Sequence, residues 1–296
     1  MQIIDAHHHF WDIERNYLPW LCDERPVLFR YGDYSALRRN YMPADYRRDV
    51  GRFEVVGSVF IETEWDPADP IGETEWVGRV AAKHGLPSAM VAQAWLDRAD
   101  AEEVLAAHGA NPLVRGIRHK PRAAAGPDLA AAGIVSSMTD PSWRRGFAML
   151  ARNDLSFDLQ VPWWHLGEAR MLADDFDETT LILNHTGLPS DRSAEALARW
   201  RAALTMLAGA PNANIKISGI GIPGRPWTVA DNRSIVLDAI DVFGPARVMF
   251  ASNFPVDSLV GSFETIFAGF DEITANFSQA ERKAMFCENA RRIYRL

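Results

Sequence analysis

The sequence predicts an α/β fold, a (β/α)8 TIM barrel that forms a single domain over residues 1–296, and three observations carry this prediction. Eight short runs are mostly apolar on successive residues, as are strands buried on both faces of a parallel sheet. Segments with apolar residues at helical spacing separate these runs, and such alternation indicates parallel strands joined by helices. The chain has 296 residues, 48% of them hydrophobic, and no repeat, low-complexity tract or linker divides it.

The expected strands cover residues 3–9, 54–62, 88–95, 113–118, 157–161, 180–184, 214–218 and 247–252. A helix expected over 73–84 ends at Gly85, because glycine accepts the left-handed conformation that terminates many helices. A second helix, 195–208, carries an apolar stripe at helical spacing. The last helix begins with a capping box, in which Glu281 follows Ser278 by three residues.

Two long segments without strand signals, 12–45 and 119–141, are expected to lie over the mouth of the barrel rather than to separate domains. The first is expected to pack through its aromatic side chains, Trp20, Phe29, Tyr31, Tyr34 and Tyr41. Active-site groups of such barrels lie at the carboxyl ends of the strands, so the residues directly after each run are the candidates for function.

Composition and charge exclude several classes of protein. A net charge of −8 argues against nucleic-acid binding, because phosphates attract basic surfaces. No stretch approaches the roughly 20 apolar residues that span a bilayer, and the first residues are too few and too polar for a signal peptide. The two cysteines, Cys22 and Cys287, lie far apart in the chain, as expected for reduced thiols. We expect a cytoplasmic protein with a small-molecule substrate; its oligomeric state, a homo-oligomer included, stays open.

The first expected strand ends in a His-x-His pair. An apolar run that begins at Ile3 leads directly to His7, His8 and His9. Because successive side chains of a strand point to opposite faces, His7 and His9 are expected to project together and His8 to point away. Two imidazoles that converge at a strand end can bind a metal ion or hold a reacting water.

Two further histidines follow later strands. His185 comes directly after the sixth strand and is expected in the site, with a buried imidazole bonded to a backbone carbonyl as the structural alternative. His165 opens a helix after the fifth strand, where it can either take part in catalysis or cap and pack.

Charged and aromatic side chains after other strands are candidates for substrate binding. Arg118 ends the fourth strand and can clamp a carboxylate through two parallel hydrogen bonds, with Lys120 beside it; the alternative is a solvated basic face. Glu62 follows the second strand. Trp11 and Trp163 can pack on a sugar-like ring, with core filling as the alternative.

The chain resembles the amidohydrolase superfamily, and in particular its branch of metal-dependent TIM-barrel hydrolases, which includes lactonases of sugars and of aromatic degradation. The resemblance covers nearly the whole chain in the same order. It rests on Ile-Asp-Ala-His-His-His-Phe-Trp-Asp at 4–12, Arg-Gly-Ile-Arg at 115–118, Phe-Asp-Leu-Gln at 157–160, Asn-His-Thr-Gly at 184–187, Lys-Ile-Ser-Gly at 216–219 and Met-Phe-Ala-Ser-Asn-Phe-Pro-Val-Asp at 249–257.

The resemblance implies hydrolysis by an activated water. Members of the superfamily use the His-x-His pair, histidines after the fifth and sixth strands and an acid after the eighth; the matching positions are His7, His9, His165 or Asp158, His185 and Asn253. The resemblance also implies a divalent metal such as zinc, for which His7, His9 and His185 are the expected ligands; a metal-free route stays open, because the same branch is held to include lactonases that work without a bound metal.

Asn253 departs from the family pattern, which has aspartate at this position. An amide has no basic lone pair, so Asn253 cannot be the general base. Three alternatives stay open. A metal lowers the pKa of a bound water, or His185, His165 or Asp257 takes the proton while Asn253 orients the water, or the protein has lost hydrolysis.

The expected function is that of a lactonase, a hydrolase that opens a small sugar-acid or dicarboxylate lactone. An activated ester needs less assistance than an amide, so the loss of one carboxylate is more tolerable for a lactone. The alternatives are a non-oxidative decarboxylase of the same superfamily and a non-catalytic barrel that only binds its ligand.

Overall fold

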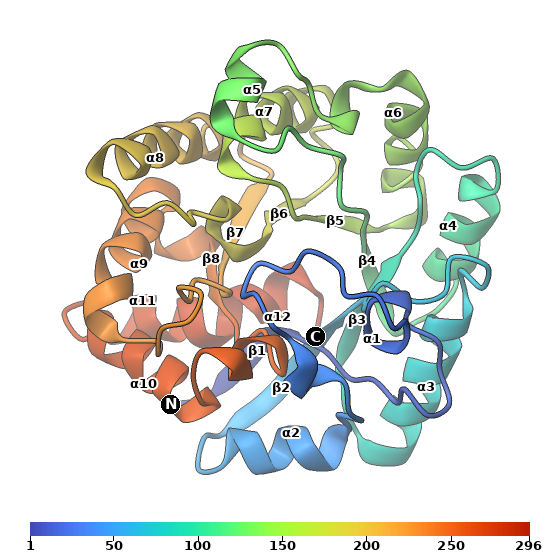
Figure 1. Cartoon of the computed structure of the whole chain (residues 1–296), viewed down its shortest axis with the longest axis horizontal. Helices are drawn as coiled ribbons and strands as arrows, with labels where there is room; N and C mark the ends of the chain where they lie inside the picture. Colours follow the sequence, from blue (N-terminus) through green and yellow to red (C-terminus); the bar gives the residue numbers. More distant parts are fainter.

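The computed structural model describes residues 1–296 and confirms the barrel: one sheet of eight parallel strands in the order β1 to β8, surrounded by helices (Figure 1). Each expected run overlaps one strand, and their ends differ by at most two residues. The strands are β1 (Ile3–His8), β2 (Val55–Ile61), β3 (Ala89–Gln93), β4 (Val114–Arg118), β5 (Ser156–Leu159), β6 (Leu181–Leu183), β7 (Ala213–Ile217) and β8 (Val248–Phe250).

The outer helices follow the strands in turn and bury their apolar faces against the sheet. They are α2 (Pro43–Val50), α3 (Gly72–His84), α4 (Ala101–Gly109), α6 (Pro141–Phe147), α7 (Leu166–Asp175), α8 (Ala194–Ala208), α9 (Val229–Phe243) and α10 (Phe263–Ile273). Helix α3 ends at Gly85 in the left-handed conformation, as expected, with φ +71°. No helix is both long and apolar enough to cross a membrane.

The last helical segment differs from the single helix that the sequence predicts. The capping box of Ser278 and Glu281 is present, but a π-helical turn over Ala284–Glu288 separates α11 (Gln279–Lys283) from α12 (Asn289–Ile293). Directly after α12, the hydroxyl of the fully buried Tyr294 donates to Asp158 at 2.9 Å. The end of the chain therefore packs into the interior of the barrel.

Backbone and side-chain hydrogen bonds join β1 to the segment after β8 and close the barrel. The backbone N–H of Asn253 donates to the carbonyl of His7 at 2.8 Å. The Asp5 carboxylate accepts the backbone N–H of Ser252 at 2.8 Å and its hydroxyl at 2.6 Å. These bonds hold the segment after β8 against β1, and this segment contains Asn253.

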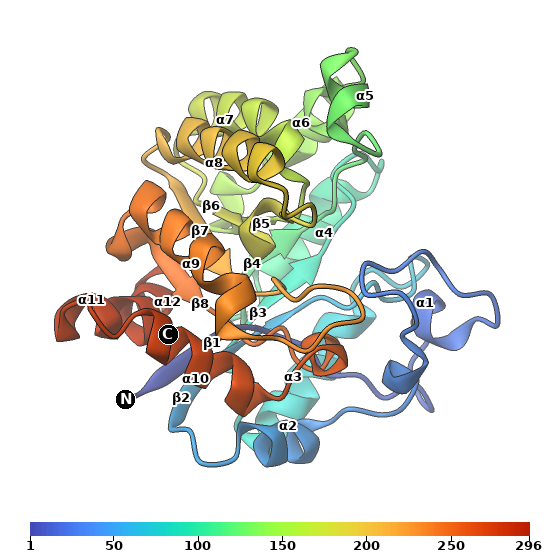
Figure 2. The same ribbon diagram turned by 60° about the vertical axis from the view of Figure 1, so that its left-hand side comes forward.

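The segment 12–45, which includes α1 (Pro19–Cys22), extends from one end of the barrel (Figure 2). Its aromatic side chains pack as expected. Trp20 and Phe29 stack with ring centroids 5.7 Å apart, and Tyr34 and Tyr41 are buried. The segment 119–141 contains α5 (Pro127–Ala131).

Candidate active site

A β-bulge in β1 lies at the start of the three consecutive histidines. Asp5 pairs with Ser58 and His8 with Phe60, so β1 has one more residue than β2 over this stretch. Bulges of this kind re-aim side chains next to active sites. The ring of His7 lies 5.0 Å from that of His9, measured between centroids, which confirms that the two histidines project together.

His8 points the other way, as expected. Its ring packs among the rings of Phe10, Tyr46 and Phe60, with the nearest centroid 4.6 Å away. On the opposite side of the strand, the ring of His7 lies 4.6 Å from that of His185. The His-x-His pair of β1 thus meets the histidine that follows β6.

A cavity of about 400 Å³ opens over these strand ends. Its walls include both the ends of the strands and the segment 12–45. Seven of the side chains predicted for the site line it: His9, Trp11, Glu62, Arg118, Lys120, His185 and Asn253. His7 lies beneath the cavity, while His165, Trp163 and Asp257 do not line it.

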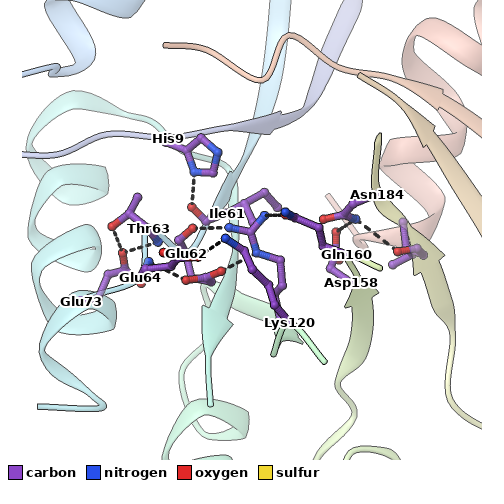
Figure 3. Close-up of polar contacts among 12 residues, drawn as sticks. His9, Ile61, Glu62, Thr63, Glu64, Glu73, Lys120, Asp158, Gln160 and Asn184 are labelled. Carbon is purple, nitrogen blue, oxygen red and sulfur yellow. Dashed lines mark hydrogen bonds and ion pairs between the residues drawn. The ribbon is translucent and has the colours of Figure 1, made fainter. Parts of the chain in front are cut away.

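The hydrogen bond of His9 fixes which of its ring nitrogens carries the proton. Nδ1 lies 2.7 Å from the carbonyl oxygen of Ile61 (Figure 3). A carbonyl oxygen only accepts hydrogen bonds, so Nδ1 carries the proton and Nε2 keeps its lone pair. Burial, and after it the charge of Arg118, lowers the pKa of His9 to about 3. His9 is therefore neutral at pH 7, with a free acceptor nitrogen.

His185 stands in a turn with unusual backbone angles. His185 and Thr186 both have φ +53°, in the left-handed region that is costly for such residues and frequent at functional sites. Its Nδ1 lies 2.9 Å from the hydroxyl of Ser218. Burial, and after it the charge of Arg30, lowers the pKa of His185, so this imidazole is also neutral at pH 7.

Asn253 is oriented by Asp257, which stands behind it. The Asn253 amide donates to Asp257 at 2.6 Å, so its carbonyl oxygen stays available as an acceptor. Asp257 also accepts the hydroxyl of Tyr31 at 3.0 Å and the backbone N–H of Gly219 at 3.1 Å, and burial raises its pKa. The interaction with Asn253 acts to raise the pKa of His9. Asp257 is thus a positioning residue for Asn253.

Arg118 is held by protein groups. Its Nε donates to the carboxylate of Glu62, Nη2 donates to the Glu62 backbone carbonyl at 2.7 Å, and Nη1 donates to Gln160 at 3.1 Å. Lys120 pairs in the same way with Glu64 (Figure 3). Glu62 occupies the side of the guanidinium formed by Nε and Nη2, so the expected clamp of Arg118 on a substrate carboxylate would have to use the N–H groups that remain on Nη1 and Nη2. Arg118 still lines the cavity and keeps two of its five N–H groups.

His165 and Trp163 lie apart from the cavity. The Nε2 of His165 accepts the backbone N–H of Ala124 at 2.9 Å, and its Nδ1 lies 2.8 Å from Glu168. Both ring nitrogens are engaged, so the structure gives His165 the capping and packing role that the sequence left open. Trp164, rather than its neighbour Trp163, lines the cavity.

Asp158, the alternative to His165, lies in the interior of the barrel. It forms a fully buried ion pair with Lys216 and accepts the Asn184 amide at 2.8 Å. Burial lowers the pKa of Lys216 to about 8. Asp158 does not line the cavity, so this pair forms the polar floor beneath the histidines.

The histidines do not form a donor set suited to a divalent ion. His7 has two buried ring nitrogens without partners, which favours a ligand there. However, no three His, Cys, Asp or Glu side chains are arranged to hold an ion, and Asn253 replaces the usual carboxylate. The nearby side chains whose charges act on these imidazoles are cations, Lys216 and Arg118 for His7 and Arg30 and Arg118 for His185. The zinc expected from the family pattern therefore lacks a matching set of ligands.

Sequence reasoning missed two of the four cations that line the cavity, Arg30 and Arg192. Neither follows a strand directly, so the rule that selects strand ends does not find them. Arg30 belongs to the segment 12–45, and Arg192 precedes α8. Only the folded positions of these segments bring the two side chains to the cavity.

Comparisons with known proteins agree with this architecture. The family model described as Amidohydrolase matches residues 4–296. The protein y4mH of Sinorhizobium fredii is 41% identical over 99% of this chain and 98% of its own. An L-fucono-1,5-lactonase of Burkholderia multivorans is 30% identical over 99% of this chain and 96% of its own. The crystal structure of an amidohydrolase from Burkholderia multivorans with bound zinc is 28% identical, covers 100% of both chains and has a TM-score of 0.80.

Proposed function

This chain belongs to the amidohydrolase family, and we propose that it hydrolyses a small lactone, with His9 as the acceptor of the water proton. The observation that carries the proposal is that Nε2 of His9 and the carbonyl oxygen of Asn253 adjoin at the cavity, because Ile61 holds the other ring nitrogen of His9 and Asp257 holds the amide nitrogen of Asn253. The 30% identity with an L-fucono-1,5-lactonase supports a cyclic ester as the class of substrate.

In the proposed reaction, a water is held between Nε2 of His9 and the carbonyl oxygen of Asn253. The water oxygen bonds to the lactone carbonyl carbon while its proton passes to Nε2. The resulting imidazolium donates to two carbonyl oxygens, that of Ile61 at Nδ1 and that of Asn253 at Nε2. The ring C–O bond then breaks, the proton passes from Nε2 to the ring oxygen, and the product is a hydroxy acid.

The second task is to stabilise the negative charge that develops on the lactone carbonyl oxygen. Arg118 suits this task, because Glu62 and Gln160 hold its guanidinium in place and two N–H groups remain. Donors fixed in advance stabilise such an oxyanion without reorganisation during the reaction. Arg118 is therefore assigned the binding of a substrate oxygen in this proposal.

The low basicity of His9 matches an ester substrate. A base with a pKa near 3 keeps its lone pair at pH 7 but takes a proton with little driving force. A lactone is an activated ester that needs less assistance than an amide. The ring of Trp11 stacks against that of His9, with centroids 6.3 Å apart, and offers an apolar wall for the substrate ring.

A screen of aldonolactones and muconolactones by proton release tests the proposal. The screen is run on chelator-treated protein and on protein supplied with zinc. We expect turnover of at least one lactone by the chelator-treated protein and no gain from zinc. Release of carbon dioxide from an aromatic acid would favour the decarboxylase. Binding of lactones without turnover would favour a barrel that only binds its ligand. Strict dependence of turnover on zinc would contradict the role given to His9.

A further inference from the structure

Two arginines from distant parts of the chain lie over the segment that follows β7 and line the cavity. Gly219, which follows β7 and has φ +59°, provides the surface on which Arg30 lies. A Cβ atom at Gly219 would lie 2.5 Å from Nη2 of Arg30 and 2.6 Å from Nδ1 of His185. Arg192 donates from its Nη2 to the carbonyl of Ile220 at 2.7 Å. Both guanidinium groups therefore gather over the same short segment at the cavity.

These guanidinium groups have donors without acceptors. Nη1 of Arg30, and Nε and Nη1 of Arg192, are buried and have no hydrogen-bond partner. Arg192 takes part in no ion pair, and the only carboxylate near Arg30 is Asp257, at 3.4 Å. Asp257 already accepts three other hydrogen bonds. Buried N–H groups of a cation are costly when unpaired, so this pair of side chains is suited to an anionic partner.

The other two cations of the cavity already have carboxylate partners within the protein. Arg118 is paired with Glu62, and Lys120 is paired with Glu64. Among the charged side chains that line the cavity, four are cations and two are carboxylates, although the chain as a whole has a net charge of −8. Arg192 has no ion pair and Arg30 has only the 3.4 Å contact with Asp257, so the positive charge of the cavity is least compensated at these two arginines.

We propose that Arg30 and Arg192 bind an anionic oxygen group of the substrate, a carboxylate or a phosphate ester, while the ring carbonyl lies against His9 and Arg118. A guanidinium matches the planar oxygens of these groups with parallel hydrogen bonds. Arg30 lies next to His185, which lines the same cavity as His9. The anionic group therefore lies close to the reacting carbonyl, as it does when both belong to one small lactone ring. The position of the ring carbonyl rests on the proposed function, whereas the binding of an anion by Arg30 and Arg192 does not depend on it.

Binding of unreactive ring analogues tests the inference independently of turnover. Tetrahydrofuran-2-carboxylate and tetrahydrofurfuryl phosphate carry the anionic group, and tetrahydrofurfuryl alcohol is the neutral control. Each is titrated by calorimetry into the wild-type protein and into Arg192→Met, Arg192→Lys and Arg79→Met. Arg79 is a matched control, because its exposed side chain lies on α3 away from the cavity. Far-UV circular dichroism checks that each variant is folded.

We expect one anionic analogue to bind at least about tenfold more tightly than the alcohol, and its identity distinguishes carboxylate from phosphate. Arg192→Met removes this preference, Arg192→Lys keeps part of it and Arg79→Met keeps all of it. Equal binding of anionic and neutral analogues, or a preference that survives Arg192→Met, would overturn the inference, as would no binding of either anion. If the preference is found but no lactone is hydrolysed, the anion site stands and the proposed function fails.

Discussion

Replacement of Asn253 by aspartate tests the arrangement of the site in two ways. The Asn253 amide nitrogen lies 2.6 Å from an oxygen of Asp257, so Asn253→Asp places two carboxylates in contact. Two unit charges with centres about 4 Å apart repel by about 4 kcal/mol at an effective dielectric constant of about 20. We expect the free energy of unfolding to fall by about 3–5 kcal/mol at pH 8, including the lost hydrogen bond.

The loss depends on pH and on metal ions. Two carboxylates in contact share a proton, so the pKa of one is raised in the folded protein above its unfolded value. The stability of Asn253→Asp is then highest at pH 5 and is lost as the pH rises toward 8. Zinc is expected to restore the stability of Asn253→Asp as a proton does. The new carboxylate lies beside the histidines and gives a divalent ion the acidic ligand that the wild-type protein lacks.

Urea unfolding at pH 5 and pH 8, with chelator and with zinc, measures both effects. Asn253→Ala is the control, since it removes the hydrogen bond without adding a charge. Its loss of stability is expected to change little with pH or zinc. Equal stability of Asn253→Asp at the two pH values would mean that the new carboxylate faces away from Asp257, and the orientation given to Asn253 would then be wrong.

The remaining predictions concern four other residues. His7→Ala is expected to lower turnover at least about a hundredfold with the barrel intact, because its ring packs against those of His9 and His185 and holds them in position, and near-normal turnover of the folded variant would contradict the site. His165→Ala is expected to cost about 2–4 kcal/mol of stability with kcat within tenfold, because both its nitrogens hold other segments; urea unfolding and kinetics separate the two roles. Burial, and after it Glu62, raises the pKa of Glu73 to about 8, so its contribution to stability is complete below about pH 4.5 and is lost toward pH 8. Glu73→Gln is therefore expected to be more stable than wild type by about 2 kcal/mol at pH 8.5 but not at pH 4.5, and parallel pH curves would show that Glu73 stays ionised. Gly219→Ala is expected to reduce kcat/KM at least about tenfold, since a Cβ there collides with Arg30 and His185; wild-type kinetics would contradict this close approach.

The sequence predicted the barrel well, because its strands are short, apolar and separated by helices with clear endings. The same alternation placed His7 and His9 on one side and His8 on the other. The bulge in β1 between Asp5 and His8 has no signal in the sequence, because it depends on how β1 pairs with β2.

The site was predicted where function follows strand ends, and missed where it depends on packing between distant segments. Arg118 does end β4, but its partner Glu62 comes from the end of another strand, and no local pattern shows that the two are paired. His165 carries a residue type suited to catalysis, yet both of its nitrogens are used by neighbouring segments. Arg30 and Arg192 reach the cavity only through the folded positions of the segments that carry them.

The central claim is that His9, aided by Asn253, takes the proton from water in place of the missing carboxylate. The most direct test compares wild type with His9→Gln, which keeps a polar side chain of similar length, on the best lactone from the screen. Both proteins are treated with chelator, and their metal content is measured. We expect chelator-treated wild type to hydrolyse the lactone and His9→Gln to lose at least about a hundredfold in kcat with its urea unfolding curve unchanged. Turnover by His9→Gln within tenfold of wild type, or wild-type turnover that appears only with zinc, would contradict the account.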